Sequence, residues 1–236
     1  MYKIGIIDEI NPKGLEVLKN NKNFEYELIT DLSKDNLLKK LPEFDGITLR
    51  RGKIDSELLM KCERLKVISR HGVGYDNVDT NYLKENNIKL LVTDSSTSTS
   101  PSEHIMYMIL SIYKGINMFD TIVRNGNFTK AILSEIDNSF ELNNKNILIV
   151  GFGRIGRKLI KKCLGFDLNV YVYDPFVNER IIKSFGGVKI TDFHNQLKKT
   201  DILSLSLPLN DKTHNLISIK EMKLMKKSSI IINASR

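Results

Sequence analysis

The sequence predicts an α/β protein that contains two doubly wound parallel sheets. Short apolar runs alternate with helical patterns along the chain, which is typical of strand–helix units around a parallel sheet. The run DSSTSTS at positions 94–100 is too small and polar to pack a core, and it divides the alternation into two series. We therefore expect one domain at residues 1–97 and another at residues 98–236.

Five apolar runs in the first series have the length and composition of strands. They span residues 3–7, 24–28, 46–49, 65–69 and 89–92, and helical patterns lie between them near residues 12–20, 33–41, 56–62 and 81–86. Five strand–helix repeats are enough to complete a small doubly wound domain.

A long helix is expected to open the second series. Ser100 has the place of an N-cap, Pro101 that of the first helical residue, and Glu103 can return a capping-box bond. Apolar residues at helical spacing continue to about Met118. Five further strands are expected at residues 146–150, 169–173, 188–191, 202–207 and 229–233.

The composition favours an ordinary globular protein of a reducing compartment. The net charge is +8, but the lysines are spread among acidic residues without a basic, aromatic-rich block, so we expect a solvated surface and no nucleic-acid partner. No apolar run approaches the roughly 20 residues that span a bilayer, and the N-terminus reads as a strand, not a signal peptide. Cys62 and Cys163 lie far apart, which favours buried thiols and a cytoplasmic location.

A glycine motif opens the second series of strands. Gly151, Gly153 and Gly156 fit G-x-G-x-x-G between an apolar strand and a helix expected at residues 157–164. The first glycine permits a tight turn, the second lets a pyrophosphate approach the backbone, and the third lets helix and strand pack closely. Asp174, at the end of the next strand, can hold both ribose hydroxyls and would repel a 2′-phosphate, so NAD is favoured over NADP. A glycine turn without a nucleotide is the alternative.

The stretch RHGVGYDNVD at positions 70–79 follows a strand of the first series. In open α/β sheets, ligands bind at the carboxyl ends of the strands. Gly72 and Gly74 would expose backbone N–H groups to a small anion there. A simple strand-to-helix turn, with Asp79 as the cap of the next helix, explains the same residues, and the two interpretations are compatible.

Four motifs together resemble a known family, the D-isomer-specific 2-hydroxyacid dehydrogenases. These motifs are RHGVGYDNVD, GFGRIGRKLIKKCLGFDLNVYVYDPF, LPLNDKTHNLI and INASR, and they follow one another over nearly the whole chain. The resemblance implies a flavodoxin-like substrate domain and an NAD-binding Rossmann domain. It also implies reversible oxidation of a small D-2-hydroxy acid to the 2-oxo acid, and a homodimer that forms through the cofactor domain.

The same resemblance implies roles for single residues. Gly72, Val73 and Gly74 match the loop that contacts the substrate carboxylate and the nicotinamide, and Arg236 matches the catalytic arginine. A guanidinium there can bind the carboxylate bidentately and polarise the 2-oxo group. The remaining cofactor positions are Arg154 and Ile155 at the phosphates, Asp174 at the ribose, Leu207 and Pro208 at the adenine side, and Ala234, Ser235 and Arg236 beside the nicotinamide.

The glutamate and histidine that move the proton in this family fall after the arginine, and the sequence ends at Arg236. We interpret the histidines at positions 71, 104, 194 and 214 as structural or surface residues. Either the sequence is a fragment of a longer dehydrogenase, or it is a relative without the proton-transfer pair. The alternatives to an enzyme are an NAD-sensing regulator similar to the C-terminal-binding corepressors, and an inactive chain that only binds NAD.

Arg50 and Arg51 follow the third strand of the first series and provide a hypothesis about the substrate. Arg50 resembles an arginine that some phosphoglycerate dehydrogenases use against a phosphate. A solvated basic pair is the alternative, and the sequence favours neither. We expect no metal site.

Overall fold

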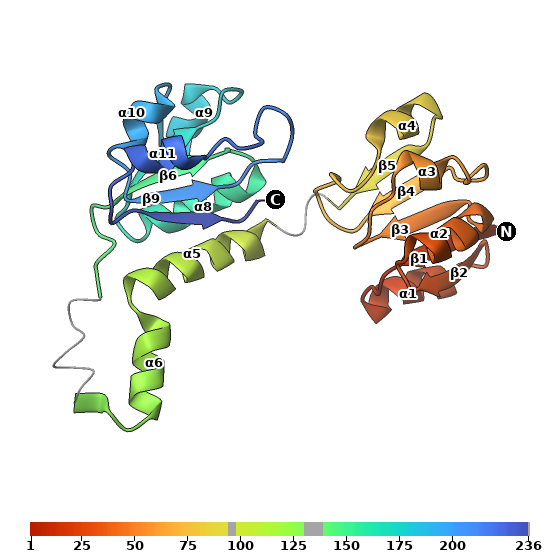
Figure 1. Ribbon diagram of the computed structural model, residues 1–236, viewed down its shortest axis with the longest axis horizontal. Helices are drawn as coiled ribbons and strands as arrows, with labels where there is room; N and C mark the ends of the chain where they lie inside the picture. Colours follow the sequence, from red (N-terminus) through yellow and green to blue (C-terminus); the bar gives the residue numbers. More distant parts are fainter. Residues whose placement is uncertain (94–97, 130–138, 236) are drawn as a thin grey trace. The chain divides into compact units, whose positions relative to one another are not determined.

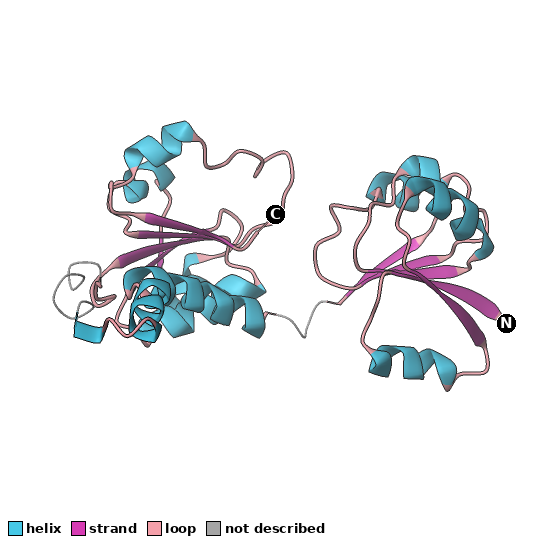
Figure 2. Ribbon diagram, turned by 60° about the horizontal axis from the view of Figure 1, so that its bottom comes forward, coloured by secondary structure: helices cyan, strands magenta, loops and turns pink. Residues whose placement is uncertain are grey.

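The computed structural model describes residues 1–93, 98–129 and 139–235. The chain divides into two compact units, Met1–Thr97 and Ser98–Arg236. Each unit contains a five-stranded parallel sheet with helices on both faces (Figure 1, Figure 2). The α/β class and the two parallel sheets expected from the sequence are therefore confirmed.

The first unit has the strand order β2-β1-β3-β4-β5, which is the flavodoxin-like order. Its strands are β1 (Tyr2–Ile7), β2 (Phe24–Ile29), β3 (Gly46–Leu49), β4 (Val67–Arg70) and β5 (Lys89–Val92). Its helices are α1 (Pro12–Lys19), α2 (Lys34–Lys40), the 3-10 turn η1 (Leu41–Glu43), α3 (Ser56–Leu59) and α4 (Thr80–Glu85). A single buried cluster packs α2, α3 and α4 against the sheet around Phe44, Ile47 and Leu59.

The second unit has the strand order β10-β9-β6-β7-β8, which is the order of a Rossmann half-sheet extended by two strands. Its strands are β6 (Asn146–Val150), β7 (Asn169–Tyr173), β8 (Val188–Lys189), β9 (Ile202–Leu205) and β10 (Ile230–Asn233). Its helices are α5 (Thr99–Tyr113), α6 (Ile116–Arg124), α8 (Arg154–Leu164), α9 (Glu179–Ser184), α10 (Phe193–Leu197) and α11 (Ile219–Leu224).

The sheet of the second unit has a core on each face. Helices α5 and α8 cover one face, where Ile109, Ile149 and Leu159 are fully buried. Helices α10 and α11 lie on the other face, over Leu148 and Leu203. Because the strands are parallel, their carboxyl ends meet at one edge of the sheet. The loops after β6, β7, β9 and β10 therefore lie close together.

The long helix after the polar run begins and ends differently from the prediction. Helix α5 starts at Thr99 with Ser98 as its N-cap and without a side-chain cap bond, so Ser100 is not the N-cap and Pro101 is the third helical residue. Proline is tolerated there because the first turn has no intrahelical acceptor for its missing N–H. The helix stops at Tyr113, since Gly115 adopts a left-handed conformation (φ 58°) before α6 begins. Residues 94–97 of the polar run lie outside the described residues.

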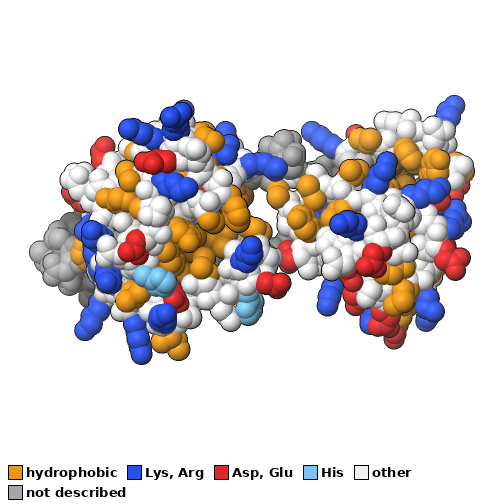
Figure 3. All heavy atoms as spheres, turned by 90° about the horizontal axis from the view of Figure 1, so that it is seen from above, with side chains coloured by type: hydrophobic (Ala, Val, Ile, Leu, Met, Phe, Trp, Pro, Cys, Tyr) orange, Lys and Arg blue, Asp and Glu red, His pale blue; other side chains and the backbone are white. Residues whose placement is uncertain are grey.

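On the face that Figure 3 shows, lysine and arginine side chains (blue) are scattered among acidic and apolar ones. In the described ranges, no helix has the length and apolarity that a membrane crossing needs. Within the same residues, no group of three or more His, Cys, Asp or Glu side chains could hold a metal ion.

Candidate functional site

The glycine loop between β6 and α8 depends on positions where a side chain could not fit. A Cβ atom at Gly151 would lie 2.4 Å from the Ser206 carbonyl oxygen, and Gly151 has a φ of +96°. A Cβ atom at Gly156 would lie 2.4 Å from the Gly151 carbonyl oxygen. Gly153 instead faces open space and is the N-cap of α8. The loop is thus tightly held at both ends and open in the middle, which fits a pyrophosphate at the helix N-terminus.

The carboxylate of Asp174 lies across this loop, directly after β7. Its Oδ2 accepts a hydrogen bond from the Phe152 N–H at 2.8 Å. Its Oδ1 accepts from the N–H groups of Phe176 (2.9 Å) and Val177 (3.2 Å). These three bonds use three of the roughly four lone-pair sites of the carboxylate. The acid is therefore fixed in position while an acceptor site on Oδ2 remains for a ribose hydroxyl.

The two residues after Gly153 begin α8. Arg154 is its exposed first residue, and Ile155 is partly buried against the core beneath α5 and α8. Arg157 follows one turn later, where its Nε donates to the Phe152 carbonyl at 3.2 Å and its guanidinium lies over the Phe152 ring. Basic groups thus gather at the helix N-terminus, where a phosphate would be bound.

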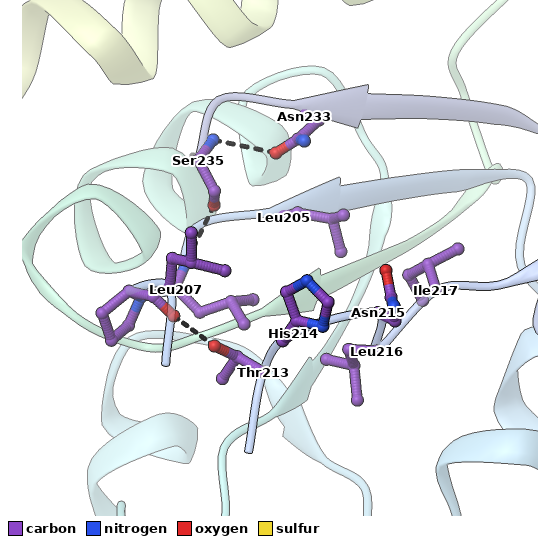
Figure 4. Close-up of a pocket in the computed structure, with 11 residues that line it drawn as sticks. Leu205, Leu207, Thr213, His214, Asn215, Leu216, Ile217, Asn233 and Ser235 are labelled. Carbon is purple, nitrogen blue, oxygen red and sulfur yellow. Dashed lines mark hydrogen bonds between the residues drawn. The ribbon is translucent and has the colours of Figure 1, made fainter. Parts of the chain in front are cut away.

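A pocket of about 360 Å³ brings together Leu207, Pro208 and Ser235, three residues that the sequence assigned to the cofactor (Figure 4). The Leu207 N–H donates to Ser235 Oγ at 3.0 Å, which joins the loops after β9 and β10. Thr213 Oγ1 donates to the Pro208 carbonyl at 2.5 Å and closes the loop after β9.

The same pocket contains polar residues that the sequence did not assign to the cofactor, including His214. His214 and Asn215 line it together with Thr213, and Figure 4 shows them on the loop opposite Leu205 and Asn233. Their position within the motif LPLNDKTHNLI is the sequence feature that could have indicated them as pocket residues. Ala234 lines a second pocket, which it shares with His104 and Pro101 near the start of α5. Arg236 lies outside the described residues.

A buried arginine, Arg70, packs against the glycine stretch of the first unit. Gly72 has a φ of +140°, and its N–H donates to Thr93 Oγ1 at 2.7 Å. Arg70 is only 5% exposed and lies beneath it, where Nη1 donates to the carbonyls of Leu49 (3.2 Å) and His71 (2.5 Å). The sequence does not indicate this role of Arg70, because the residue ends a strand and one of its acceptors, the Leu49 carbonyl, is 21 residues away.

Two further residues of that stretch face outward. The Val73 side chain is exposed, and Gly74 is partly exposed beside it. The Asn77 side chain donates to the Gly52 carbonyl at 2.6 Å, so the loop after β4 is tied to the loop after β3. The residues expected to contact a substrate carboxylate are therefore on a fixed, accessible turn.

The adjacent arginines of the first unit have different surroundings. Arg51 makes a bidentate ion pair with the buried Asp8, with distances of 2.6 Å from Nε and 2.8 Å from Nη2. Arg50 lies farther away, at 4.0 Å from the same carboxylate, and donates to the Glu9 carbonyl at 3.3 Å. The hydrogen bond from Arg51 is the main reason why the pKa of Asp8 falls to about 2. The Arg51 guanidinium is thus paired with Asp8, whereas the Arg50 side chain is half exposed at the end of β3.

A histidine–glutamate contact is present, but it has a structural explanation. His194 Nε2 lies 3.3 Å from Glu221 Oε1. The other oxygen of Glu221 accepts from the N–H and hydroxyl of Ser218 in a capping box at the start of α11, and these bonds lower the Glu221 pKa to about 2. This glutamate therefore serves as a helix cap.

The fold and the glycine loop define a protein of two doubly wound units, one of which has the features of a dinucleotide-binding domain. Residues 4–141 match the family model of the D-isomer specific 2-hydroxyacid dehydrogenase catalytic domain, and residues 106–236 match that of its NAD-binding domain. The chain belongs to the D-isomer specific 2-hydroxyacid dehydrogenases. The expected cofactor, NAD, is confirmed by the domain match and by similar structures that contain NAD.

Similar proteins include several named dehydrogenases and reductases. A D-3-phosphoglycerate dehydrogenase of Methanocaldococcus jannaschii is 31% identical over all of this chain, and a glyoxylate reductase of Thermococcus litoralis is 33% identical over 99% of it. The matches cover 44% and 72% of those proteins. The chain thus spans less than half the length of the phosphoglycerate dehydrogenase. A D-lactate dehydrogenase from Aquifex aeolicus, solved with NAD and lactic acid, has a TM-score of 0.87 at 29% identity, with 99% of this chain and 69% of that one covered.

The Asp8–Arg51 pair predicts a pH-dependent stability of the first unit. A carboxylate whose folded pKa is lowered stabilises the fold above its unfolded pKa of about 3.9, and this contribution is lost as the pH falls to about 2. Replacement of Asp8 by Asn should therefore lower the free energy of unfolding near neutral pH, and the difference from the original chain should vanish over that acidic range. Urea unfolding at several pH values measures the free energy of unfolding of each variant, and Glu9→Gln is the control. A difference that is independent of pH would contradict the assignment.

The position of Asp174 predicts a preference for NAD over NADP. NAD should raise the melting temperature more than NADP, because the carboxylate accepts from ribose hydroxyls and repels a 2′-phosphate. In Asp174→Asn, the affinity for NAD should fall about tenfold, the usual scale for a lost charged hydrogen bond. The affinity for NADP should fall less. Thermal shift and calorimetric titration check both effects, with Asp120→Asn on α6 as the control. Equal stabilisation of the original chain by both cofactors would refute this prediction.

Proposed function

We propose that this protein is an NAD-dependent oxidoreductase of small D-2-hydroxy acids. The observation that carries the proposal is the glycine loop at the start of α8, with Asp174 hydrogen-bonded across it. The match of both units to the corresponding family domains supports the same reaction class. NAD supplies the chemistry of the hydride, which moves between C2 of the acid and the nicotinamide.

In this proposal, the residues of the second unit hold the cofactor. Backbone N–H groups at Gly153 and the start of α8, with Arg154 and Ile155, bind the pyrophosphate. Asp174 orients the adenosine ribose. The loops after β9 and β10 hold the remaining parts, with Leu207 and Pro208 at the adenine side and Ala234 and Ser235 beside the nicotinamide.

We assign two groups to the binding of the acid. The turn at Gly72, Val73 and Gly74 offers backbone N–H groups to the substrate carboxylate, and its exposure and its braced geometry support this role. We assign Arg236 to the carboxylate and the 2-oxo oxygen on the basis of its place in the motif INASR. A guanidinium there stabilises the negative charge that develops on that oxygen.

We propose that the substrate is 3-phosphoglycerate or a hydroxypyruvate- or glyoxylate-type acid. Relatives with each of these activities in their names are similar over nearly the whole chain. The half-exposed Arg50 supports the phosphorylated acid, because its guanidinium remains at the end of β3 while Arg51 is bound to Asp8. A dianionic phosphate is the substituent that such a cation would select.

We further propose a cytoplasmic homodimer that forms through the second unit. Helix α6 has no buried residue, and Ile116 and Val123 are exposed on it. On α5, Tyr107 and Ile112 are exposed as well. A second copy of these helices would remove this apolar surface from water. The free and buried thiols of Cys62 and Cys163 support a reducing compartment.

The proposed activity predicts NADH oxidation with a 2-oxo acid. The absorbance of the reduced nicotinamide should fall with glyoxylate, hydroxypyruvate or 3-phosphohydroxypyruvate. Gly151→Ala should abolish this signal because its Cβ would meet the Ser206 carbonyl. Stereochemical analysis of the product should give the D-hydroxy acid. NAD binding without turnover, together with NAD-dependent association with a partner protein, would instead favour a regulator.

The position of Arg50 predicts selectivity for a phosphorylated substrate. Arg50→Ala should raise KM for 3-phosphohydroxypyruvate about tenfold or more, since a charged hydrogen bond is lost, and should leave KM for glyoxylate unchanged. Arg51→Ala is the matched control, because Arg51 is paired with Asp8 and should change stability and not selectivity. Steady-state kinetics with both acids distinguishes these effects. Equal changes for the two acids in Arg50→Ala would exclude a phosphate-specific role.

A further inference from the structure

Arg157 is an exposed residue of α8 whose side chain reaches back to the glycine loop. Its Nε donates to the carbonyl of Phe152, five positions earlier, at 3.2 Å. Its guanidinium carbon lies 5.6 Å from the centre of the Phe152 ring and 5.9 Å from the centre of the Phe185 ring. Helical side chains lean toward the N-terminus of their helix, which explains how this one meets the preceding loop. Arg157 therefore contacts the loop through a hydrogen bond and through two aromatic rings.

The stability of the helix does not by itself explain an arginine at this place. The N-terminus of a helix carries a partial positive charge, so cations near it are unfavourable. Helix α8 nevertheless begins with Arg154, has no acidic residue in its first turn, and continues with Arg157 and Lys158. We therefore looked for the effect of Arg157 on the loop that precedes the helix.

The direction of the Phe152 carbonyl determines the direction of the next backbone N–H group. The peptide bond between Phe152 and Gly153 is planar and trans, so its C=O and N–H point in opposite directions. Because Arg157 binds the carbonyl, the Gly153 N–H points away from Arg157. Gly153 lies beside open space, since a Cβ atom added to it would meet nothing within 4 Å. This N–H is one of the groups that we assign to the pyrophosphate.

The peptide plane between Phe152 and Gly153 needs a restraint of this kind. The Phe152 ring is fully buried and its N–H donates to Asp174 Oδ2 at 2.8 Å, so the start of the residue is fixed. Gly153 has no side chain, so its φ can change at low cost and the plane before it can turn. The helix ladder begins one residue later, where the Gly153 carbonyl accepts from the Arg157 N–H at 3.0 Å. The bond from Arg157 Nε to the Phe152 carbonyl opposes the rotation of this plane.

We propose that Arg157 is a positioning residue for NAD, which aims the Gly153 N–H at the pyrophosphate by holding the Phe152 carbonyl. This inference rests on the proposed function, in which the glycine loop binds the pyrophosphate. Arg157 needs no contact with the cofactor in this role. It holds the donor in its binding direction before NAD arrives, and a donor that is already ordered binds more tightly because the cost of ordering it is removed.

The test compares Arg157→Gln with Arg157→Met, two uncharged variants of similar length. The amide nitrogen of glutamine is as many bonds from Cα as Nε of arginine, so it can donate to the Phe152 carbonyl without a positive charge. Methionine packs well on aromatic rings but has no donor. Lys158→Gln is the charge control, because it removes a cation from the next exposed residue of the same helix. NAD, ADP-ribose and adenosine are titrated into each variant by calorimetry.

The expected result separates the aim of the donor from charge and from packing. Arg157→Met should weaken NAD and ADP-ribose about tenfold, the scale of a hydrogen bond to a charged group. It should leave the affinity for adenosine unchanged, because adenosine has no phosphate. Arg157→Gln should retain most of the affinity for all three ligands, since its amide replaces the lost donor. Lys158→Gln should bind all three like the original chain.

Four outcomes would overturn the inference. Equal NAD affinity in Arg157→Met and the original chain would show that the Gly153 N–H does not depend on Arg157. Equal losses in Arg157→Met and Arg157→Gln would assign the effect to the charge of the arginine. A matching loss of adenosine affinity in Arg157→Met would assign it to the packing of the loop. Failure of the original chain to bind NAD would reject the proposed function together with this inference, and it is recognised because it appears before any variant is compared.

Discussion

Three backbone segments meet at the end of β6 at distances that leave no room for a Cβ atom. The carbonyl of Ser206 lies against Gly151, and the carbonyl of Gly151 lies against Gly156. These contacts set the direction in which α8 leaves the sheet, and α8 in turn covers one face of the core through Leu159, Ile160 and Cys163. The geometry that would bind a pyrophosphate is therefore also the geometry that closes the core of the second unit.

Asp174 connects the glycine loop to the loop after the next strand, β7. Its carboxylate joins Phe152 of the glycine loop to Phe176 and Val177 of the following loop. The Gly151 N–H also joins these two loops, because it donates to the Tyr173 carbonyl at 2.9 Å. The carboxylate that we propose as the ribose acceptor therefore also supports the architecture of the sheet edge, and controls elsewhere on the surface are needed to separate the two effects.

The sequence was sufficient for features that depend on local pattern. Alternating apolar runs predicted the ten strands of the two sheets, and the spacing of Gly151, Gly153 and Gly156 predicted the tight loop. The start of α5 was predicted incorrectly, because Ser98 and Ser100 are chemically equal candidates for the cap. The end of α5 was missed because a glycine at position 115 can either continue a helix or turn out of it.

The site was less predictable wherever it depends on contacts between distant residues. Asp8 lies 43 residues from Arg51, and nothing near either residue in the sequence indicates that they pair. The same holds for Arg70, whose acceptors include a carbonyl 21 residues away.

The three buried clusters have a consequence for how the chain unfolds. One cluster contains residues of the first unit only, and the other two contain residues of the second unit only. Each unit therefore has a hydrophobic core of its own, which cooperative unfolding of a domain requires. A nucleotide that binds the folded second unit, and not its unfolded chain, would raise the free energy of unfolding of that unit by mass action.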